Sequence, residues 1–369
     1  MKGAAIVVGG GIGGLAAGIA LGRAGMDVTV FERAQEIRPL GAGLSIWPNG
    51  VSALRALGAD GVVDAPGVSR GGGALRRSDG STLAEFDPAV LTERYGEPLV
   101  GLHRGALHLA LIEALGRDRL ELGMEVQCLS GEGLRLAGGM EVQAELIVGA
   151  DGLHSILRSE ILGDGEPDDS GIVAYRGVSA WERPVPAGEW WAADSIAGLL
   201  PLPEGKVYWY LAHRGDPERE VFDRLLAQYD VPLPQVVSAT PADEVLCHRL
   251  YDRDPADTWS RGRATLLGDA AHPMLPFLGQ GACAALEDAL ELGDAVATAD
   301  DAQQAIGRYE AKRLDRTAAL VKGSRQAAKA ALMGSAAGRR VRNALVSRVP
   351  AAMRLRQLDQ VIGRRKHHQ

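Results

Sequence analysis

The sequence of 369 residues is poor in cysteine, in aromatic residues and in long hydrophobic runs. Its three cysteines, Cys128, Cys247 and Cys283, are scattered, which argues against a disulfide framework or a dithiol redox site and indicates a reducing compartment. No apolar run reaches the roughly 20 residues that span a bilayer, so no integral membrane segment is expected. A net charge of −7 argues against a nucleic-acid partner. These absences predict a cytoplasmic globular protein.

Glycine, in contrast, is abundant, and its most ordered cluster lies near the N-terminus. An apolar run at 4–8 precedes the cluster, a small-residue helical pattern follows it, and a second apolar run at 28–31 ends in an acid. The order strand, glycine turn, helix, strand, acid is typical of a dinucleotide-binding unit. The candidate cofactor residues of this unit are Gly9, Gly11, Ile12, Gly13, Gly14, Glu32 and Arg33.

Each residue type in this unit has a physical role. Gly9 permits a tight turn, Gly11 lacks the Cβ that would keep a pyrophosphate away, and Gly14 lets helix and strand pack closely. The helix N-terminus offers free N–H groups to the pyrophosphate. Glu32 can accept hydrogen bonds from ribose hydroxyls, which suits FAD or NAD better than NADP. The alternative, an ordinary glycine turn, leaves the acid at this distance unexplained.

The remaining sequence predicts two interleaved parts. From 172 to about 250 the chain is rich in tryptophan and alternates in polarity, which indicates an antiparallel sheet. The other predicted elements are a loop at 38–50, helices at 51–57, 106–115 and from 281 toward 296, and strands at 125–129, 141–148 and 264–267. The pattern therefore predicts a nucleotide-binding part that is interrupted by pieces of a second, sheet-based part.

Three spaced motifs carry a resemblance to a known family. They are the glycine cluster with Glu32, the segment Gly149-Ala150-Asp151-Gly152, and Gly268-Asp269 followed by Pro276 and Gly279-Gln280-Gly281. The set resembles the single-component FAD-dependent aromatic hydroxylases, the class A flavoprotein monooxygenases that include p-hydroxybenzoate and salicylate hydroxylases. The resemblance extends to about residue 320.

The resemblance and the pattern together predict an α/β fold. A Rossmann-like FAD-binding domain, interrupted by a mostly antiparallel β-sheet substrate domain, is expected to end in C-terminal helices. The FAD-binding domain is expected at 1–70, 100–168 and 262–369, and the substrate-binding sheet domain at 71–99 and 169–261. No second glycine fingerprint follows a strand elsewhere, so NADH or NADPH is expected to dock transiently.

Further cofactor contacts follow from position and from the resemblance. Asp269 ends a buried strand, where open α/β sheets bind ligands, so it can accept from a ribityl hydroxyl. The resemblance implies that Arg104 and Asp151 contact FAD. The helix after Gly281 could stabilise negative charge on a reduced flavin. The further cofactor candidates are Arg104, Asp151, Asp269, Pro276, Gly279, Gln280 and Gly281, and no metal site is expected.

The implied reaction is hydroxylation of a small aromatic or heteroaromatic substrate with NAD(P)H and O₂, through a flavin C4a-hydroperoxide, by a monomer or homodimer. Tyr208, Tyr210 and Arg176 are the candidates for activating the substrate, with Tyr175 and His213 as further possibilities. Strand alternation places Tyr208 and Tyr210 on one face and His213 on the other, so only one set can face the substrate. The alternative is an aromatic sheet core with Arg176 in a structural ion pair.

Departures from family members and the basic tail leave other interpretations open. Ser45 stands where the 6-hydroxynicotinate type is expected to carry histidine, and Ile196 stands near an arginine expected in urate-hydroxylating relatives. Epoxidation, modification of an antibiotic or polyketide, and a non-catalytic flavin-binding redox module are alternative functions.

The tail from Gly338 carries nine Lys or Arg and one acid, Asp359. It predicts a helix pair packed on the FAD domain, or an amphipathic surface for acidic lipid.

Overall fold

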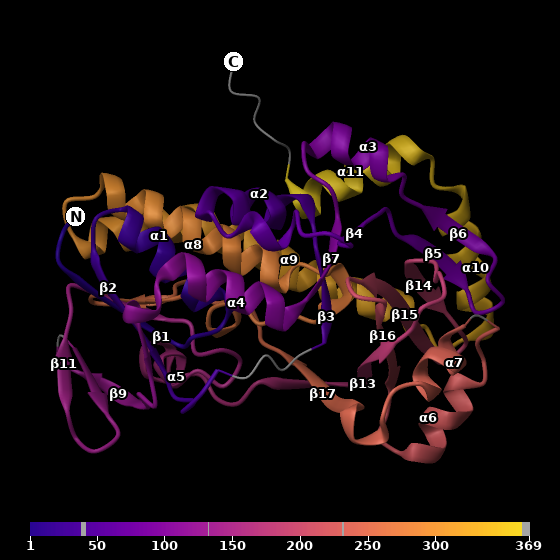
Figure 1. Cartoon of the computed structure of the whole chain (residues 1–369), viewed down its shortest axis with the longest axis horizontal. Coiled ribbons are helices and arrows are strands. Elements are labelled where there is room, and N and C mark those ends of the chain that lie inside the picture. Colours follow the sequence, from indigo (N-terminus) through magenta and orange to yellow (C-terminus); the bar gives the residue numbers. More distant parts are fainter. Residues whose placement is uncertain (38–41, 132, 231, 364–369) are drawn as a thin grey trace.

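A parallel sheet forms around the glycine segment in the computed structural model, which describes residues 1–37, 42–131, 133–230 and 232–363. The predicted loop residues 38–41 and the tail residues 364–369 lie outside this part. The six strands of the sheet, in spatial order, are β18 (Ser260–Arg261), β19 (Ala264–Leu266), β12 (Leu146–Gly149), β1 (Ala4–Val8), β2 (Asp27–Glu32) and β8 (Leu120–Leu122). All neighbours are parallel except β18 and β19. This sheet agrees with the predicted Rossmann-like arrangement (Figure 1).

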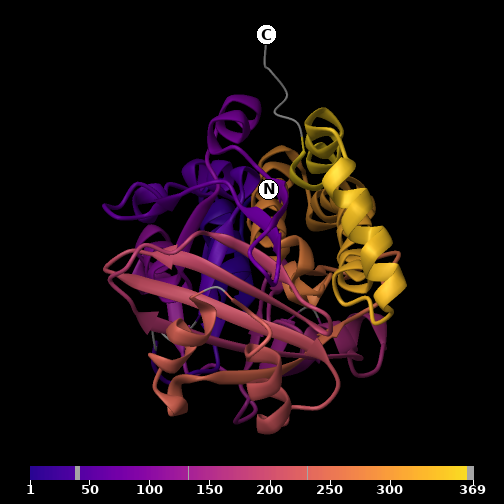
Figure 2. The same cartoon turned by 90° about the vertical axis from the view of Figure 1, so that its right-hand side faces the viewer.

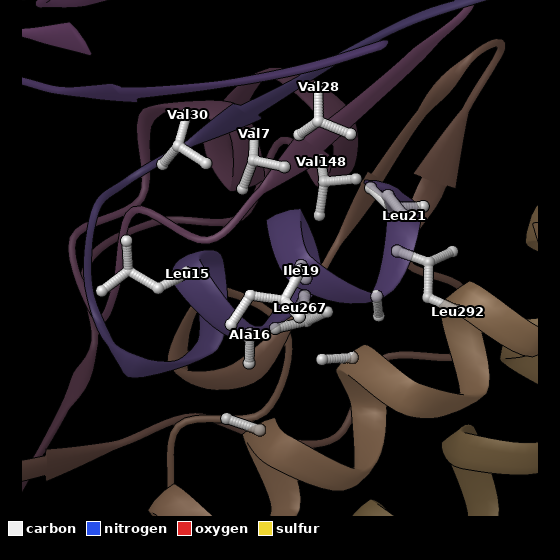
Figure 3. Packing of buried hydrophobic residues seen from close by; sticks show 14 of the residues in the cluster. Val7, Leu15, Ala16, Ile19, Leu21, Val28, Val30, Val148, Leu267 and Leu292 are labelled. Atoms are coloured by element: carbon white, nitrogen blue, oxygen red, sulfur yellow. The ribbon is translucent and has the colours of Figure 1, made fainter. Parts of the chain in front are cut away.

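Helices cover this sheet, and the helix after the glycine turn is buried on both sides. The helices of this part are α1 (Ile12–Arg23), α2 (Pro48–Leu57), α4 (Arg104–Leu115), α5 (Ile156–Leu162), α8 (Gly281–Thr298) and α9 (Ala302–Ala331). Figure 3 shows α1, with Ile19 near its middle, between the strands that carry the labelled valines and the helix α8. The two helices approach closely at Gly293 of α8, because a Cβ there would lie 2.9 Å from the Cβ of Ala20.

A second, mostly antiparallel sheet has seven strands. Their spatial order is β17 (Leu246–Asp252), β13 (Asp168–Ala180), β16 (Lys206–Arg214), β15 (Ser195–Leu202), β14 (Gly188–Trp191), β5 (Ala74–Arg77) and β6 (Thr82–Glu85). Only β14 and β5 are parallel neighbours. The helices α6 (Arg219–Leu226) and α7 (Leu233–Ser238) cover one face, over a core that contains Trp190 and Trp209 (Figure 1). The opposite face is turned toward the nucleotide-binding part, where Ile196 and Ala212 pack with Leu275.

Two small sheets complete the strands and correct one prediction. One contains β3 (Gly43–Ile46), β7 (Val100–His103) and β4 (Ser69–Arg70), and the other β11 (Glu141–Gln143), β10 (Gly133–Leu136) and β9 (Val126–Ser130). The single strand predicted at 141–148 is wrong. It is two strands, because β11 pairs with β10 in a hairpin whereas β12 enters the parallel sheet. The predicted domain boundaries stay a prediction.

The C-terminal helices lie along one side of the molecule, as Figure 2 shows. They are α10 (Ala336–Arg348) and α11 (Ala351–Ile362), next to α3 (Pro88–Tyr95). Arg94 of α3 and Asp359 of α11 form a two-point ion pair at 2.7 and 2.5 Å. The Arg342 guanidinium of α10 lies 4.4 Å from the Trp191 ring centroid, so α10 packs on the seven-stranded sheet and not only on the nucleotide-binding part.

The structure adds two general observations. Short 3₁₀ helices occupy Asp60–Val62 (η1), Arg117–Arg119 (η2), Ala242–Glu244 (η3), Gly268–Ala270 (η4) and Pro276–Leu278 (η5). Among the described helices, none combines the length and apolar character that crossing a membrane requires.

Candidate active site

The glycines of the turn between β1 and α1 differ in the space around them: some are packed against neighbouring atoms, and one is not. Gly9 has a φ of +107°, and a Cβ on Gly14 would lie 1.9 Å from the Gly9 carbonyl oxygen. A Cβ on Gly13 would lie 2.9 Å from Leu267, whereas one on Gly11 would meet nothing within 4 Å. No side chain caps α1, which begins at Ile12. The backbone at Gly11 and the free N–H groups of α1 are therefore accessible to a phosphate.

Glu32 is held at the carboxyl end of β2, next to this turn. Its Oε2 accepts from Gly10 N–H at 2.7 Å, and its Oε1 accepts from Ala34 N–H at 2.8 Å. His108 of α4 contacts the Gly10 carbonyl from the other side, at 2.6 Å. Arg33 is exposed. The remaining lone pairs of the Glu32 carboxylate suit the hydroxyls of an adenosine ribose.

Asp151 has a structural contact that the sequence did not indicate. Its carboxylate accepts from the Ser155 hydroxyl at 2.5 Å and from the Ile156 and Leu157 N–H groups at 2.8 and 3.3 Å. Asp151 therefore stabilises the N-terminus of α5. Burial raises its pKa, and these hydrogen bonds oppose the shift.

Asp269 lies in the short helix η4, directly after β19 and Leu267. Its side chain is accessible, and no hydrogen bond occupies its carboxylate within the described part of the chain. Desolvation by the surrounding protein raises the pKa of the Asp269 carboxyl, and the charges of His272 and Arg104 oppose that shift. A carboxylate with free acceptor positions is suited to bind hydroxyl groups of a ligand.

A buried ionic network supports the segment that carries Asp269. The Asp288 carboxylate of α8 accepts from Arg313 Nε at 2.6 Å, contacts His272 Nε2 at 2.5 Å and accepts from Gly268 N–H at 3.2 Å. Arg313 also binds Glu287, at 2.9 Å. The sequence analysis missed this network, although the adjacent acids Glu287 and Asp288 in the otherwise apolar first half of α8 were the available signal. The network holds the Gly268-Asp269 segment on α8.

The loop before α8 brings together buried polar groups. Gly279 has a φ of +62°, and a Cβ there would lie 2.7 Å from Trp47 Nε1. Gln280 is buried, and its Oε1 accepts from Asn49 Nδ2 at 3.0 Å. Trp47 Nε1, Asn49 Oδ1 and Gln280 Nε2 have no hydrogen-bond partner within the described chain. Buried polar groups without partners are costly, so these atoms fit a ligand with a polar ring edge, such as a flavin.

Tyr208, Tyr210 and Arg176 share one face of the seven-stranded sheet, and Tyr210 packs in the cluster that contains Leu275 and Phe277. A Cβ on Gly43 of β3 would lie 2.4 Å from the Tyr208 Cβ, so β3 packs directly on β16. The Tyr208 and Tyr210 ring centroids are 6.0 Å apart. Burial raises the pKa of Tyr208 to about 12, opposed by the charge and hydrogen bond of Arg176. Arg176 also contacts His248 Nδ1, at 3.3 Å.

Two further candidates lie on the wrong face of the sheet. The Tyr175 ring stacks on His213, with centroids 6.0 Å apart, and packs on Phe222 of α6 at 4.5 Å. Both side chains therefore belong to the core under α6 and α7. Tyr175 and His213, the two further possibilities for activating the substrate, thus lie on the face opposite to Arg176, Tyr208 and Tyr210.

The parallel sheet with its glycine turn and acid, together with the aromatic face that packs on Leu275 and Phe277, is the arrangement expected of an FAD-binding oxidoreductase. Residues 2–324 match the family described as "FAD binding domain", and the chain belongs to this family. It is a flavoprotein monooxygenase of the hydroxylase group, as the sequence motifs predicted.

Three similar proteins illustrate this placement. The chain is 37% identical over 334 residues to "Aurachin C monooxygenase/isomerase" of Stigmatella aurantiaca, covering 86% of this chain and 87% of that protein. It is 33% identical to "FAD-dependent urate hydroxylase" of Klebsiella pneumoniae, again covering 86% and 87%. The solved structure of Klebsiella pneumoniae HpxO complexed with FAD and uric acid superposes with a TM-score of 0.89 at 28% identity, covering 97% and 96%.

Asp269→Ala is expected to weaken FAD binding about 10- to 100-fold, because one hydrogen bond to a charged group contributes about 1.5–3 kcal/mol. Titration of the apoprotein with FAD, followed by flavin fluorescence, measures the effect. Asp257→Ala, at an exposed position, is the control and should leave the affinity unchanged. Equal affinities of the two variants would remove Asp269 from the site.

Proposed function

We propose that this monooxygenase uses NADH or NADPH and O₂ to hydroxylate a small aromatic or heteroaromatic compound that binds between the loop 275–281 and the seven-stranded sheet. Bound FAD, once reduced, supplies the activated oxygen. In this proposal the glycine turn, Glu32 and Asp269 hold the cofactor, and the sheet covers the substrate. The observation that carries the proposal is the packing of Tyr210, which shares a face with Tyr208 and Arg176, in the cluster of Leu275 and Phe277, just before Gln280, whose Nε2 has no hydrogen-bond partner within the described chain.

The residues around the proposed substrate perform three tasks. Tyr208 and Tyr210 provide hydroxyl groups for orientation, and Arg176 provides a cation that favours an ionised ring oxygen. The apolar side chains that pack on this face, among them Ile196 and Phe277, exclude water from the reacting atoms. NADH or NADPH is proposed to dock transiently, as no second dinucleotide fingerprint is present in the sequence.

The apolar character at Ile196 bears on substrate choice. Urate-hydroxylating relatives are expected to carry an arginine near this position, and Ile196 lies on the face that packs against Leu275. An isoleucine there does not favour a polar purine as substrate. The aurachin relative, whose name combines monooxygenase and isomerase, favours a second candidate in which oxygen insertion on a larger, polyketide-like compound precedes a rearrangement.

Substrate-dependent oxidation of NADH and NADPH tests the proposal. The FAD-loaded protein is mixed with each of a panel of phenols, benzoates, hydroxypyridines, hydroxyquinolines and indoles, and products are identified by mass spectrometry with ¹⁸O₂. One compound is expected to stimulate the oxidation and to gain a single ¹⁸O atom. Bound FAD without stimulation by any compound would contradict the hydroxylase function and would favour a redox module.

Tyr208→Phe is expected to lower substrate-stimulated turnover about 100-fold, because it removes a hydroxyl group that orients or activates the ring. Tyr175→Phe is the matched control, since Tyr175 lies on the opposite face of the same sheet. It should change turnover by less than about twofold. Turnover and coupling to product are measured for both. A larger loss in the Tyr175 variant would reverse the assignment of the faces.

A further inference from the structure

Glu189 occupies an unusual position on the proposed substrate face. Its backbone pairs with Gly198 of β15, Gly198 pairs with Tyr210 of β16, and Tyr210 pairs with Arg176 of β13. These four residues form one row across four strands and share a face of the sheet. The row ends in a cation on one side and a carboxylate on the other.

The absence of a side chain at Gly198 allows Tyr210 to reach Glu189. A Cβ on Gly198 would lie 2.1 Å from Tyr210 Cε1 and 2.7 Å from its hydroxyl oxygen. The Tyr210 ring therefore lies flat over β15, and its hydroxyl donates to Glu189 Oε2 at 2.5 Å. The other carboxylate oxygen, Oε1, accepts from Trp191 Nε1, also at 2.5 Å. Both oxygens of the carboxylate are thus held in place.

No salt bridge compensates the Glu189 carboxylate within the described chain. Burial raises its pKa, and the hydrogen bonds from Tyr210 and Trp191 oppose the shift. The titratable groups around it are Tyr208, Tyr210 and Tyr229. The charged groups are Arg176 in the same row, Arg342 over the Trp191 ring, and Arg76 over the Trp190 ring on the other face of the sheet. A half-buried carboxylate without a cation partner in the described chain costs stability, which argues for a role in function.

Tyr210 is in contact with the nucleotide-binding part through this face. It packs in the cluster that contains Leu275 and Phe277, which flank the loop before α8, and it remains half-buried. Because its only proton is directed to Glu189, its oxygen can offer only lone pairs to a ligand. A ligand that meets Tyr210 must therefore bring its own donor.

We propose that Tyr210 and Glu189 form a proton-accepting pair, which selects a ring substrate with an O–H or N–H group and ionises it. This inference rests on the proposed function. The substrate O–H or N–H bond breaks and its proton moves to the Tyr210 oxygen. The proton of Tyr210 passes to Glu189 Oε2, and the electron pair stays on the substrate heteroatom. Tyr210 is then a catalytic residue, and Glu189 is a positioning residue that stores the proton until the product leaves.

The probe for this pair is 4-nitrophenol, whose anion absorbs visible light strongly and whose neutral form does not. The FAD-loaded protein is titrated with it below the pKa of free 4-nitrophenol, and the difference spectrum reports ionisation. We expect the wild-type protein to ionise the probe at least about tenfold more than Glu189→Gln does. Glu204→Gln, an exposed glutamate in the turn between β15 and β16, should behave as the wild type.

Tyr210→Phe provides a second variant if Glu189→Gln binds no FAD, and it should also abolish ionisation. The pH profile of turnover gives a further readout: in Glu189→Gln the rate should recover as the pH approaches the pKa of the substrate, whereas a structural defect would lower the rate at every pH. Equal ionisation in the wild type and the variant, or none at saturating probe, overturns the pair. Ionisation without any stimulated NAD(P)H oxidation would instead overturn the hydroxylase function.

Discussion

Asp288→Ala is expected to destabilise the protein by about 3–5 kcal/mol, because it leaves the buried Arg313 with Glu287 alone and removes the carboxylate that His272 and the Gly268 N–H contact. Asp288 and Arg313 are both buried, with Nε–Oδ1 at 2.6 Å, and the carboxylate also binds the Gly268 N–H. Urea unfolding of the apoprotein measures the loss. Since the same carboxylate holds the segment of Asp269, the affinity for FAD should fall as well.

The control for this prediction is Asp294→Ala, an exposed aspartate on the same helix, which should cost less than about 0.5 kcal/mol. A second check uses pH. Burial alone would raise the pKa of Asp288, but the charges of His272 and Arg313 outweigh it and hold this pKa at about 2, below the ordinary 3.8. The contribution of Asp288 to stability is therefore present above pH 3.8 and is lost as the pH falls through about 2. The quantity to follow is the difference in unfolding free energy between the wild type and Asp288→Ala. If this difference does not decrease as the pH falls from 3.8 toward about 2, the role of the network is contradicted.

Gly14→Ala is expected to disrupt the unit around α1, because the new Cβ would lie 1.9 Å from the Gly9 carbonyl oxygen. Backbone atoms cannot move away as the end of a flexible side chain can, so we expect a loss of about 3 kcal/mol or more and no retained FAD. Thermal unfolding of the apoprotein and the flavin content after purification measure the two effects.

Gly11→Ala is the matched variant three residues earlier. It places its Cβ in open space at a φ of −77°, so the apoprotein should keep its stability to within about 0.5 kcal/mol. Its affinity for FAD should still fall, because the Cβ lies where a phosphate approaches the backbone. An unchanged affinity of the Gly11 variant would show that the pyrophosphate does not pass this residue.

Much of the fold was predictable because it follows from local patterns. The apolar run at 4–8, the glycines and Glu32 predicted β1, α1 and β2, and these elements form with Glu32 beside the turn. Helix periodicity predicted α4 and α8 to within a few residues. The strand at 141–148 failed, because a continuous polarity pattern does not reveal that its halves pair with different sheets.

The candidate site shows what local patterns could not reveal. Alternation along β16 divided Tyr208 and Tyr210 from Trp209 and His213, but only the packing of α6 and α7 on one side decided which pair faces the flavin-binding part. The Asp288 network joins residues that lie 16 to 25 positions from Asp288 in the sequence. Only the folded structure brings their opposite charges into contact.

The sequence by itself determined the cofactor class and the parallel sheet, because a dinucleotide requires a glycine turn, a helix N-terminus and an acid within one short segment. The tertiary structure alone decided the contact on which the proposed reacting end depends. Tyr210 meets Glu189 across a strand, over a residue without a side chain, and this contact depends on the pairing of three strands. Such a contact follows from strand register, which is set by the packing of the whole sheet and not by the residues between the two partners.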